Sequence, residues 1–203
     1  MSSYTYESKD IKTPLETYEW DNVWFEHTER TDADRVAYIG DSISCGTRKL
    51  ATAYSGNTLL FDGFGTSKAL DNAYFKDSIR IFAAQQGNRR AVVFNNGLHG
   101  WHLDDSTEYA EYYENFVKFI LSEIKAPLIL LLTTHVSDPE RDKRVVARNK
   151  AVRDIAEKYS LPTVDLYSLT NTEGIIGGDG VHLTPDGYNL LAKAVVEAVL
   201  RNS

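Results

Sequence analysis

The sequence has little cysteine, no excess of positive charge and no long hydrophobic run, and each scarcity argues against a class of protein. Cys45 is the single cysteine among 203 residues, so no disulfide can form within the chain, which suits a reducing compartment. The formal net charge is −7, whereas nucleic-acid-binding domains normally carry a basic surface. The same negative charge disfavours attraction to anionic lipid.

The apolar residues come in short runs. The longest run lies at 128–132, which is the length of a strand, and a membrane-spanning helix needs about 20 residues. Residues 1–10 are polar and acidic and lack the apolar stretch of a secretory signal. We therefore expect a cytoplasmic protein without a membrane span.

Short apolar runs alternate with longer amphipathic stretches along the chain. The runs predict strands at 36–39, 58–61, 91–94, 128–132 and 163–166. Helices are predicted after Ser42 and at 72–86, 108–124, 139–159 and from Pro185 onwards, with Asp105 or Ser106, Asp138 and Thr184 as capping residues. This alternation predicts an α/β fold, a flavodoxin-like three-layer α/β/α sandwich around a parallel sheet of about five strands.

The first 34 residues follow no such strand–helix pattern. They are rich in aromatic and charged side chains, among them Tyr4, Tyr6, Tyr18 and Trp20. We interpret residues 1–34 as an arm that packs its aromatic side chains on the edge of a domain formed by residues 35–203. Lining of a substrate site or a dimer contact is the alternative role for this arm.

The tripeptide Gly40-Asp41-Ser42 follows the first predicted strand directly. Open parallel sheets place their chemistry at the carboxyl ends of strands, where a serine is presented to solvent. Such a tripeptide alone is more often a simple turn. Ser44 is a rival serine, but it lies further into the following helix.

The loop before the last helix carries Asp179 and His182, three residues apart among glycines. A nucleophilic serine needs a base to take its proton, and the base needs a third group to fix its tautomer. One Asp-x-x-His turn supplies both groups. The exits of the second and third strands add glycines and polar side chains, at 62–68 and 95–102.

Together these residues resemble the SGNH hydrolases, also called GDSL-type esterases and lipases, over residues 35–203. The resemblance implies a serine esterase in which Ser42 is the nucleophile, His182 the base and Asp179 the orienting acid. It also implies oxyanion donors from the Ser42 N–H and from a glycine N–H, best matched by Gly65, with Gly63 second. Asn149 matches a helix position that is common in the family.

One block departs from the family pattern. Where the family has Gly-x-Asn-Asp, this chain reads Gly97-Leu-His-Gly100, so that His99 replaces the asparagine donor. Either a ring N–H of His99 or the amide of Asn95 then completes the oxyanion hole, and we expect a site that uses both.

Several neighbouring residues can be interpreted either as part of the site or as purely structural. Trp101 is the candidate for contact with substrate, with packing as the alternative, and His135 either contacts substrate or is structural. The ligand spacing of His99, His102 and Asp104 favours no metal site. The basic side chains of 141–153 are interpreted as the solvated face of a helix.

We expect hydrolysis of small acyl esters, acetyl esters on carbohydrates above all, through an acyl-enzyme and without cofactor or metal. The expected partner is a small-molecule ester such as an acylated sugar. The sequence leaves open whether the protein forms a homo-oligomer. The alternatives are a lysophospholipase or thioesterase, and a non-catalytic flavodoxin-like binding domain.

Overall fold

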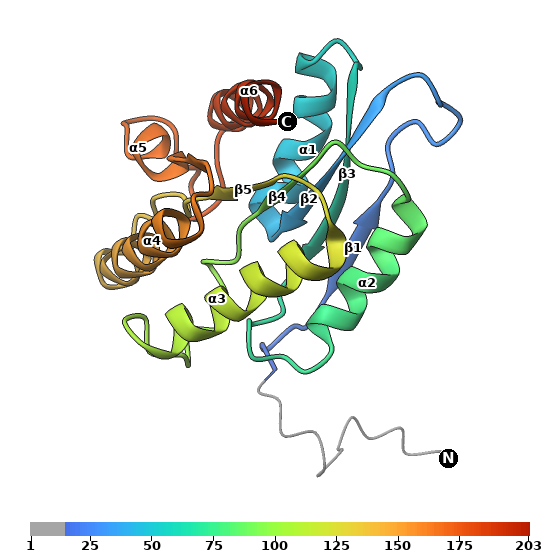
Figure 1. Cartoon of the computed structure of the whole chain (residues 1–203). Helices are drawn as coiled ribbons and strands as arrows, with labels where there is room; N and C mark the ends of the chain where they lie inside the picture. Colours follow the sequence, from blue (N-terminus) through green and yellow to red (C-terminus); the bar gives the residue numbers. More distant parts are fainter. Residues whose placement is uncertain (1–14) are drawn as a thin grey trace, which may run out of the picture.

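The computed structural model describes residues 15–203, and they form one mixed sheet covered by helices on both faces (Figure 1). The strands run in the order β1-β3-β2-β4-β5-β6. Five of them are parallel, and β1 pairs antiparallel with β3. Their bounds are β1 Asp21–Trp24, β2 Asp34–Gly40, β3 Leu59–Thr66, β4 Ala91–Phe94, β5 Leu128–Leu131 and β6 Thr163–Val164.

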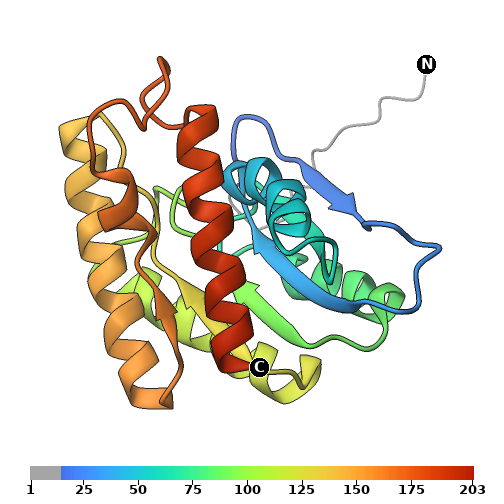
Figure 2. The same cartoon turned by 90° about the horizontal axis from the view of Figure 1, so that it is seen from above.

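The helices form the two outer layers. Their bounds are α1 Ser42–Tyr54, α2 Phe75–Gln86, α3 Glu108–Phe119, α4 Pro139–Tyr159, α5 Leu166–Thr170 and α6 Pro185–Asn202, and a π-helical turn at Ile120–Ile124 extends α3. Helices α1 and α6 pack on one face of the sheet, and α2, α3 and α4 supply the core of the other (Figures 1 and 2). This architecture is the predicted three-layer α/β/α sandwich.

Side-chain caps explain where three of the helices begin. Asp41 accepts a hydrogen bond from the N–H of Ile43 at the start of α1. Asp138 and Thr184 cap α4 and α6 in the same way, and a proline follows each of them. The capping predictions for α4 and α6 are thus confirmed, and α1 places Ser42 at its first residue.

The start of α3 differs from the prediction. Neither Asp105 nor Ser106 caps it; Asp104 instead accepts hydrogen bonds from the N–H groups of Ser106 and Thr107. Asp105 is occupied elsewhere, because it pairs with two arginines of α4.

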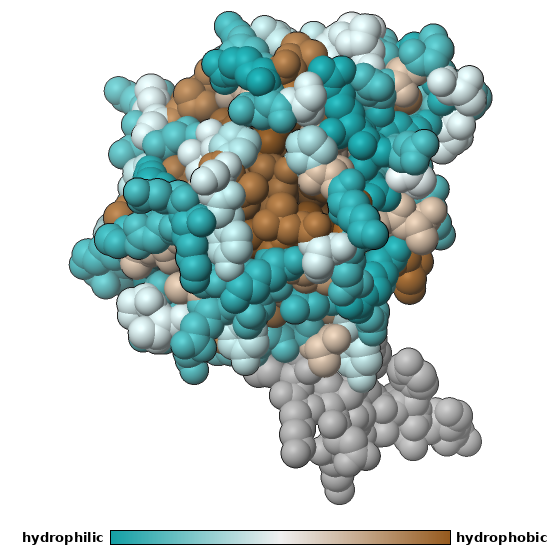
Figure 3. Space-filling view, viewed as in Figure 1, coloured by the Kyte–Doolittle hydropathy of each residue, from teal (hydrophilic) through white to brown (hydrophobic). Residues whose placement is uncertain are grey.

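The core lies on both faces of the sheet. Strands β2, β4 and β5 are almost fully buried, as their continuous apolar runs predict for parallel strands. Figure 3 shows hydrophobic residues gathered in the middle of one face of the molecule, between the helix layers, while hydrophilic residues cover most of the rest.

The N-terminal part of the described chain joins the sheet and crosses its edge. Residues 21–24 form β1, which the sequence did not predict, and all four are exposed. Phe25 stacks on Phe82 of α2, whereas Tyr18 is exposed. Tyr4 and Tyr6 lie outside the described residues.

Candidate active site

Ser42, His182 and Asp179 meet at the carboxyl end of β2. The Ser42 Oγ lies 2.9 Å from His182 Nε2, and His182 Nδ1 lies 2.6 Å from Asp179 Oδ2. Ser42 begins α1, and Asp179 and His182 lie in the loop before α6. His182 follows Ser42 by 140 residues in the sequence. The parallel sheet therefore joins the distant parts of the chain that the sequence singled out.

Three hydrogen bonds hold the Asp179 carboxylate. Besides the bond with the His182 ring, its Oδ1 accepts from the backbone N–H groups of Val181 and His182 at 3.0 and 2.9 Å. These bonds hold the pKa of Asp179 well below its ordinary value, the bond with the His182 ring contributing most. Asp179 is thus an ionised acceptor for a hydrogen on Nδ1, which leaves Nε2 as the acceptor that faces the Ser42 hydroxyl.

The loop that carries Asp179 and His182 is tied down on two sides. Its ends pair through an isolated bridge between Ile176 and Leu183, and the N–H of Gly177 donates to the His182 carbonyl at 2.6 Å. The N–H of Ser137, after β5, donates to the Gly180 carbonyl at 2.8 Å. Although His182 is exposed, its backbone is therefore held in place.

Asp41 is a buried carboxylate directly before Ser42. One of its oxygens caps α1, and the other has no hydrogen-bond partner among residues 15–203. Burial raises the pKa of Asp41, and the nearby His99 and His182 counteract part of this effect. Ser44, the rival serine, is buried and donates its hydroxyl to the Asp41 carbonyl at 2.6 Å, so it is not available as a nucleophile.

His99 lies beside the N-terminal segment of the described chain, which contacts it through Glu16 and Trp20. Its Nδ1 is 3.6 Å from Glu16 Oε1, an oxygen that also accepts from the N–H of Gly100 at 2.9 Å. The pairing with His99 lowers the pKa of Glu16. Trp20 meets the His99 ring edge to face at 6.3 Å, so two residues of the N-terminal segment orient this histidine.

Asn95 does not offer its amide to the site, which corrects the expectation that it joins His99. Its Nδ2 donates to the Leu131 carbonyl at 2.7 Å and to Thr133 Oγ1 at 3.0 Å. An amide nitrogen carries two hydrogens, so both are used in joining β4 to the exit of β5.

The register of β3 also turns the N–H of Gly65 away from Ser42. The N–H of Ser67 donates to the Trp20 carbonyl, and hydrogen-bonded pairs in an antiparallel ladder recur every second residue. The pair Asn22–Gly65 is the next such pair, so the Gly65 N–H faces β1. Gly65 serves close packing instead, because an added Cβ would lie 2.3 Å from the Cys45 sulfur.

Arg148 of α4 is the site-supporting residue that the sequence analysis missed. It is fully buried, which corrects its assignment to a solvated face. Its guanidinium donates to Asp105 and to three carbonyls of the loop that carries His99, namely those of Gly97, His99 and Gly100. A buried arginine cannot be told from an exposed one by helical spacing alone.

Trp101 and Asn149 also support this edge of the sheet. Arg148 lies over the Trp101 ring at 4.5 Å, so the placement of Trp101 favours packing over contact with substrate. Asn149, which is buried, brackets Thr133 by accepting from its N–H and donating to its carbonyl. His102 is exposed and pairs with Asp71 at 2.9 Å.

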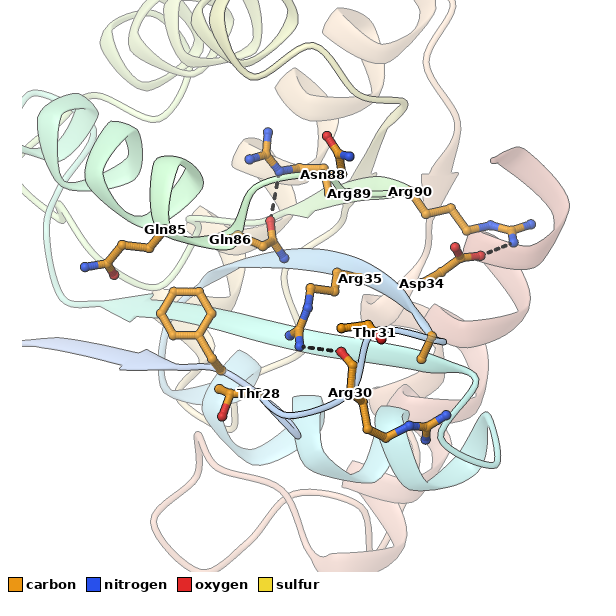
Figure 4. A pocket seen from close by; sticks show the side chains of 12 residues that line it. Thr28, Arg30, Thr31, Asp34, Arg35, Gln85, Gln86, Asn88, Arg89 and Arg90 are labelled. Atoms are coloured by element: carbon orange, nitrogen blue, oxygen red, sulfur yellow. Dashed lines mark hydrogen bonds and ion pairs between the residues drawn. The ribbon is translucent and has the colours of Figure 1, made fainter.

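A wide cleft of about 920 Å³ lies at the opposite end of the sheet, where the parallel strands begin (Figure 4). Arg30, Arg35, Arg89 and Arg90 line it, and each is already bonded to acidic side chains or to chain carbonyls, as the dashed lines of Figure 4 show in part. These partners, and the location of the cleft at the end of the sheet opposite Ser42, give the cleft no part in the chemistry.

Two further findings concern residues 15–203. None of the helices there is long and apolar enough to cross a membrane. No three histidine, cysteine, aspartate or glutamate side chains gather there as metal ligands would.

The comparisons with known proteins rest on structure, since the sequence matches no protein-family model and no curated protein. A lipolytic protein of the G-D-S-L family from Veillonella parvula is 18% identical, covers 83% of this chain and 100% of its own, and has a TM-score of 0.68. A lipase/acylhydrolase from Enterococcus faecalis is 20% identical, covers 84% of this chain and 97% of its own, and has a TM-score of 0.65. A catalytic mutant of an acetylxylan esterase from Geobacillus stearothermophilus is 15% identical, covers 85% of this chain and 96% of its own, and has a TM-score of 0.62. The chain therefore has the fold of the GDSL-type lipases and acylhydrolases.

Proposed function

We propose that this protein is a serine ester hydrolase of the SGNH type that acts through an acyl-enzyme. The observation that carries the proposal is the continuous chain of hydrogen bonds from Ser42 Oγ through the His182 ring to the Asp179 carboxylate. A fold shared with lipases and acetylxylan esterases supports it.

The reaction is a double displacement. His182 Nε2 takes the proton of Ser42 as Oγ attacks the ester carbonyl, and Asp179 stabilises the imidazolium that forms. The protonated His182 then gives its proton to the leaving alcohol, which departs as the acyl-enzyme forms. A water, deprotonated by the same histidine, attacks the acyl carbonyl and releases the acid and free Ser42.

The Ser42 N–H and the His99 ring stabilise the oxyanion. Ser42 is the first residue of α1, and the N–H groups at that position have no partner within the helix. Glu16 Oε1 lies 3.6 Å from Nδ1 of His99, so Nε2 is the ring nitrogen left for the oxyanion, and it can donate there only when both ring nitrogens carry a hydrogen. This assignment replaces Asn95 and Gly65, whose N–H groups are directed elsewhere.

We propose acetyl or other small acyl esters as substrates, with a carbohydrate as the alcohol. Two of the structures with this fold are acetylxylan esterases by name. We place the activity in residues 35–203, with the N-terminal arm packed against them, in a cytoplasmic protein.

The test is hydrolysis of nitrophenyl esters of increasing acyl length by the wild type and by Ser42→Ala. The acetate should be cleaved fastest, and Ser42→Ala should lose at least about 10³-fold in kcat, since the serine, base and acid act as a unit. Rates that rise steeply with chain length would replace the carbohydrate esterase by a lipase-type enzyme. A folded wild type that cleaves none of the esters would favour the binding-domain alternative.

A further inference from the structure

A second histidine–carboxylate pair lies at the same edge of the sheet as the triad, outside the residues used above. His135 follows β5, and its Nδ1 lies 2.8 Å from Asp142 Oδ1. Tyr167 of α5 donates its hydroxyl to the other oxygen of Asp142 at 2.7 Å and meets the His135 ring edge to face. Burial and the bond to Asp142 raise the pKa of Tyr167 to about 12, so it stays a donor.

These contacts fix the orientation of His135. Asp142 takes the Nδ1 side of the ring, and the backbone N–H of His135 is held by Thr170 at 2.9 Å. The remaining polar atom of the ring is Nε2, which for the Nδ1–H tautomer is an acceptor. Among residues 15–203 no hydrogen bond to this atom occurs, so the pair presents an ordered acceptor without a protein partner.

His135 is part of the wall of a cavity of about 260 Å³. The other lining residues belong to the segment that follows α5 and are mostly polar: Asn171, Thr172, Glu173, Gly174 and Ile176. Glu173 adds a second acceptor, while Asn171 and Thr172 can both donate and accept. A wall of this kind matches a ligand rich in hydroxyl groups, since an acyl chain would leave these polar groups unpaired.

The cavity is connected to the triad through backbone hydrogen bonds. The Thr184 N–H donates to the Ile175 carbonyl at 2.9 Å, and Ile176 bridges to Leu183. The segment that lines the cavity is therefore paired with the chain directly after His182, beside the loop that carries the triad base.

We propose that the cavity between His135 and Glu173 is a subsite for the hydroxyl-bearing alcohol of the substrate, a sugar or similar polyol. The inference rests on the proposed function, and it assigns the alcohol side of the ester to particular residues. His135 accepts a hydrogen bond from one hydroxyl and Glu173 from a second, so an alcohol with neighbouring hydroxyls is favoured over a simple one.

A kinetic test compares two esters that differ only in hydroxyl donors. One is a monoacetylated methyl pentopyranoside with its other hydroxyls free, and the other is the same monoacetate with those hydroxyls methylated. The wild type should prefer the free form in kcat/KM, and His135→Ala should lower that preference about threefold to tenfold, the cost of one hydrogen bond. His27→Asn, at the opposite end of the sheet, is the matched control and should keep the preference.

A binding test separates this inference from the proposed function. In Ser42→Ala, titration with the unacetylated methyl pentopyranoside should shift the imidazole NMR signals of His135 and leave those of His27 in place, and Glu173→Ala should weaken the effect. An unchanged preference in His135→Ala, or no shift of its signals, would overturn the subsite. Absence of hydrolysis by the wild type together with a normal shift would overturn only the esterase.

Discussion

At the scale of single residues, the site holds a buried carboxylate that lacks a full set of hydrogen bonds. The Asp41 carboxylate is only 2% exposed, and one of its oxygens lacks a partner among the described residues. A buried ionised carboxylate without full hydrogen bonding destabilises the folded state. Such exceptions are typical of functional sites, and this one directly precedes Ser42.

Replacing Asp41 by asparagine should raise the melting temperature near neutral pH. The amide keeps the acceptor for the Ile43 N–H and removes the buried charge. Because burial raises the pKa of Asp41 above the unfolded value of about 3.9, the native state takes up a proton first as the pH falls. The wild type then regains stability, so the difference should shrink from about pH 7.5 to about pH 4. Calorimetry that finds Asp41→Asn less stable at about pH 7.5 would contradict this account.

His99→Ala should reduce kcat for an acetyl ester by about 10²-fold, the effect of losing one oxyanion donor. KM should change little, because the interaction forms only in the transition state. The control is His102→Ala on the same loop, whose side chain pairs with Asp71. Steady-state kinetics that show equal rates for both variants would remove His99 from the oxyanion hole.

At the residue scale, the structure brings Ser42, His182 and Asp179 together as the sequence predicted, while their catalytic roles stay predictions. Their meeting could be foreseen because a strand exit and an Asp-x-x-His loop are local signals. The donors Gly65 and Asn95 could not be assigned, because the direction of a backbone N–H depends on strand register, and an amide is used by whichever carbonyl lies nearest after folding.

At the scale of elements, α4 is more than a cover for the sheet. It positions the loop of His99 through Arg148 and the exit of β5 through Asn149. The sequence predicted the helix and its cap correctly. Its buried polar face could not be recognised, because the partners of Arg148 lie 43 to 51 residues earlier in the chain and the partner of Asn149 lies 16 residues earlier.

Arg148→Ala should lower the free energy of unfolding by about 3–5 kcal/mol, because it leaves Asp105 without its buried partner and three carbonyls without a donor. Arg141→Ala, on the exposed side of the same helix, is the control and should cost less than about 0.5 kcal/mol. Urea unfolding followed by circular dichroism measures both. Equal losses would show that the buried arginine does not stabilise this loop.

Strand β1 was missed because it buries no side chain. Its stability comes from backbone pairing with β3, which leaves no alternating pattern in the sequence. The same register that turns the Gly65 N–H towards Asn22 directs the Asn22 N–H to β3 and the Val23 N–H outwards.

Proline substitutions test this register. Asn22→Pro removes a ladder hydrogen bond and should cost about 1–3 kcal/mol beyond Asn22→Ala, which accounts for the side-chain bond with Arg48. Val23→Pro should be better tolerated, because its nitrogen faces away from β3. Thermal unfolding that ranks Val23→Pro as the more damaging change would place the ladder one residue out of register.

At the scale of the whole molecule, the order of the five parallel strands explains where the site lies. Counted without β1, the strand order is that of flavodoxin, and the point where the order along the chain reverses lies between the parallel strands β2 and β4. Ser42 follows β2, and the loop of His99 follows β4, so both lie at the switch point where such sheets bind ligands. The predicted five-stranded α/β/α sandwich was sufficient to foresee this meeting, whereas the antiparallel strand β1, which lies within the predicted arm, could not be foreseen from periodicity.

The most direct measurement of the central claim is reaction with a fluorophosphonate probe, followed by mass spectrometry of the labelled peptide. The wild type should be labelled at Ser42, because His182 and Asp179 activate its hydroxyl. The folded Ser42→Ala variant, which keeps Ser44, should remain unlabelled. A folded wild type that does not react, or label that persists in Ser42→Ala, would contradict the account.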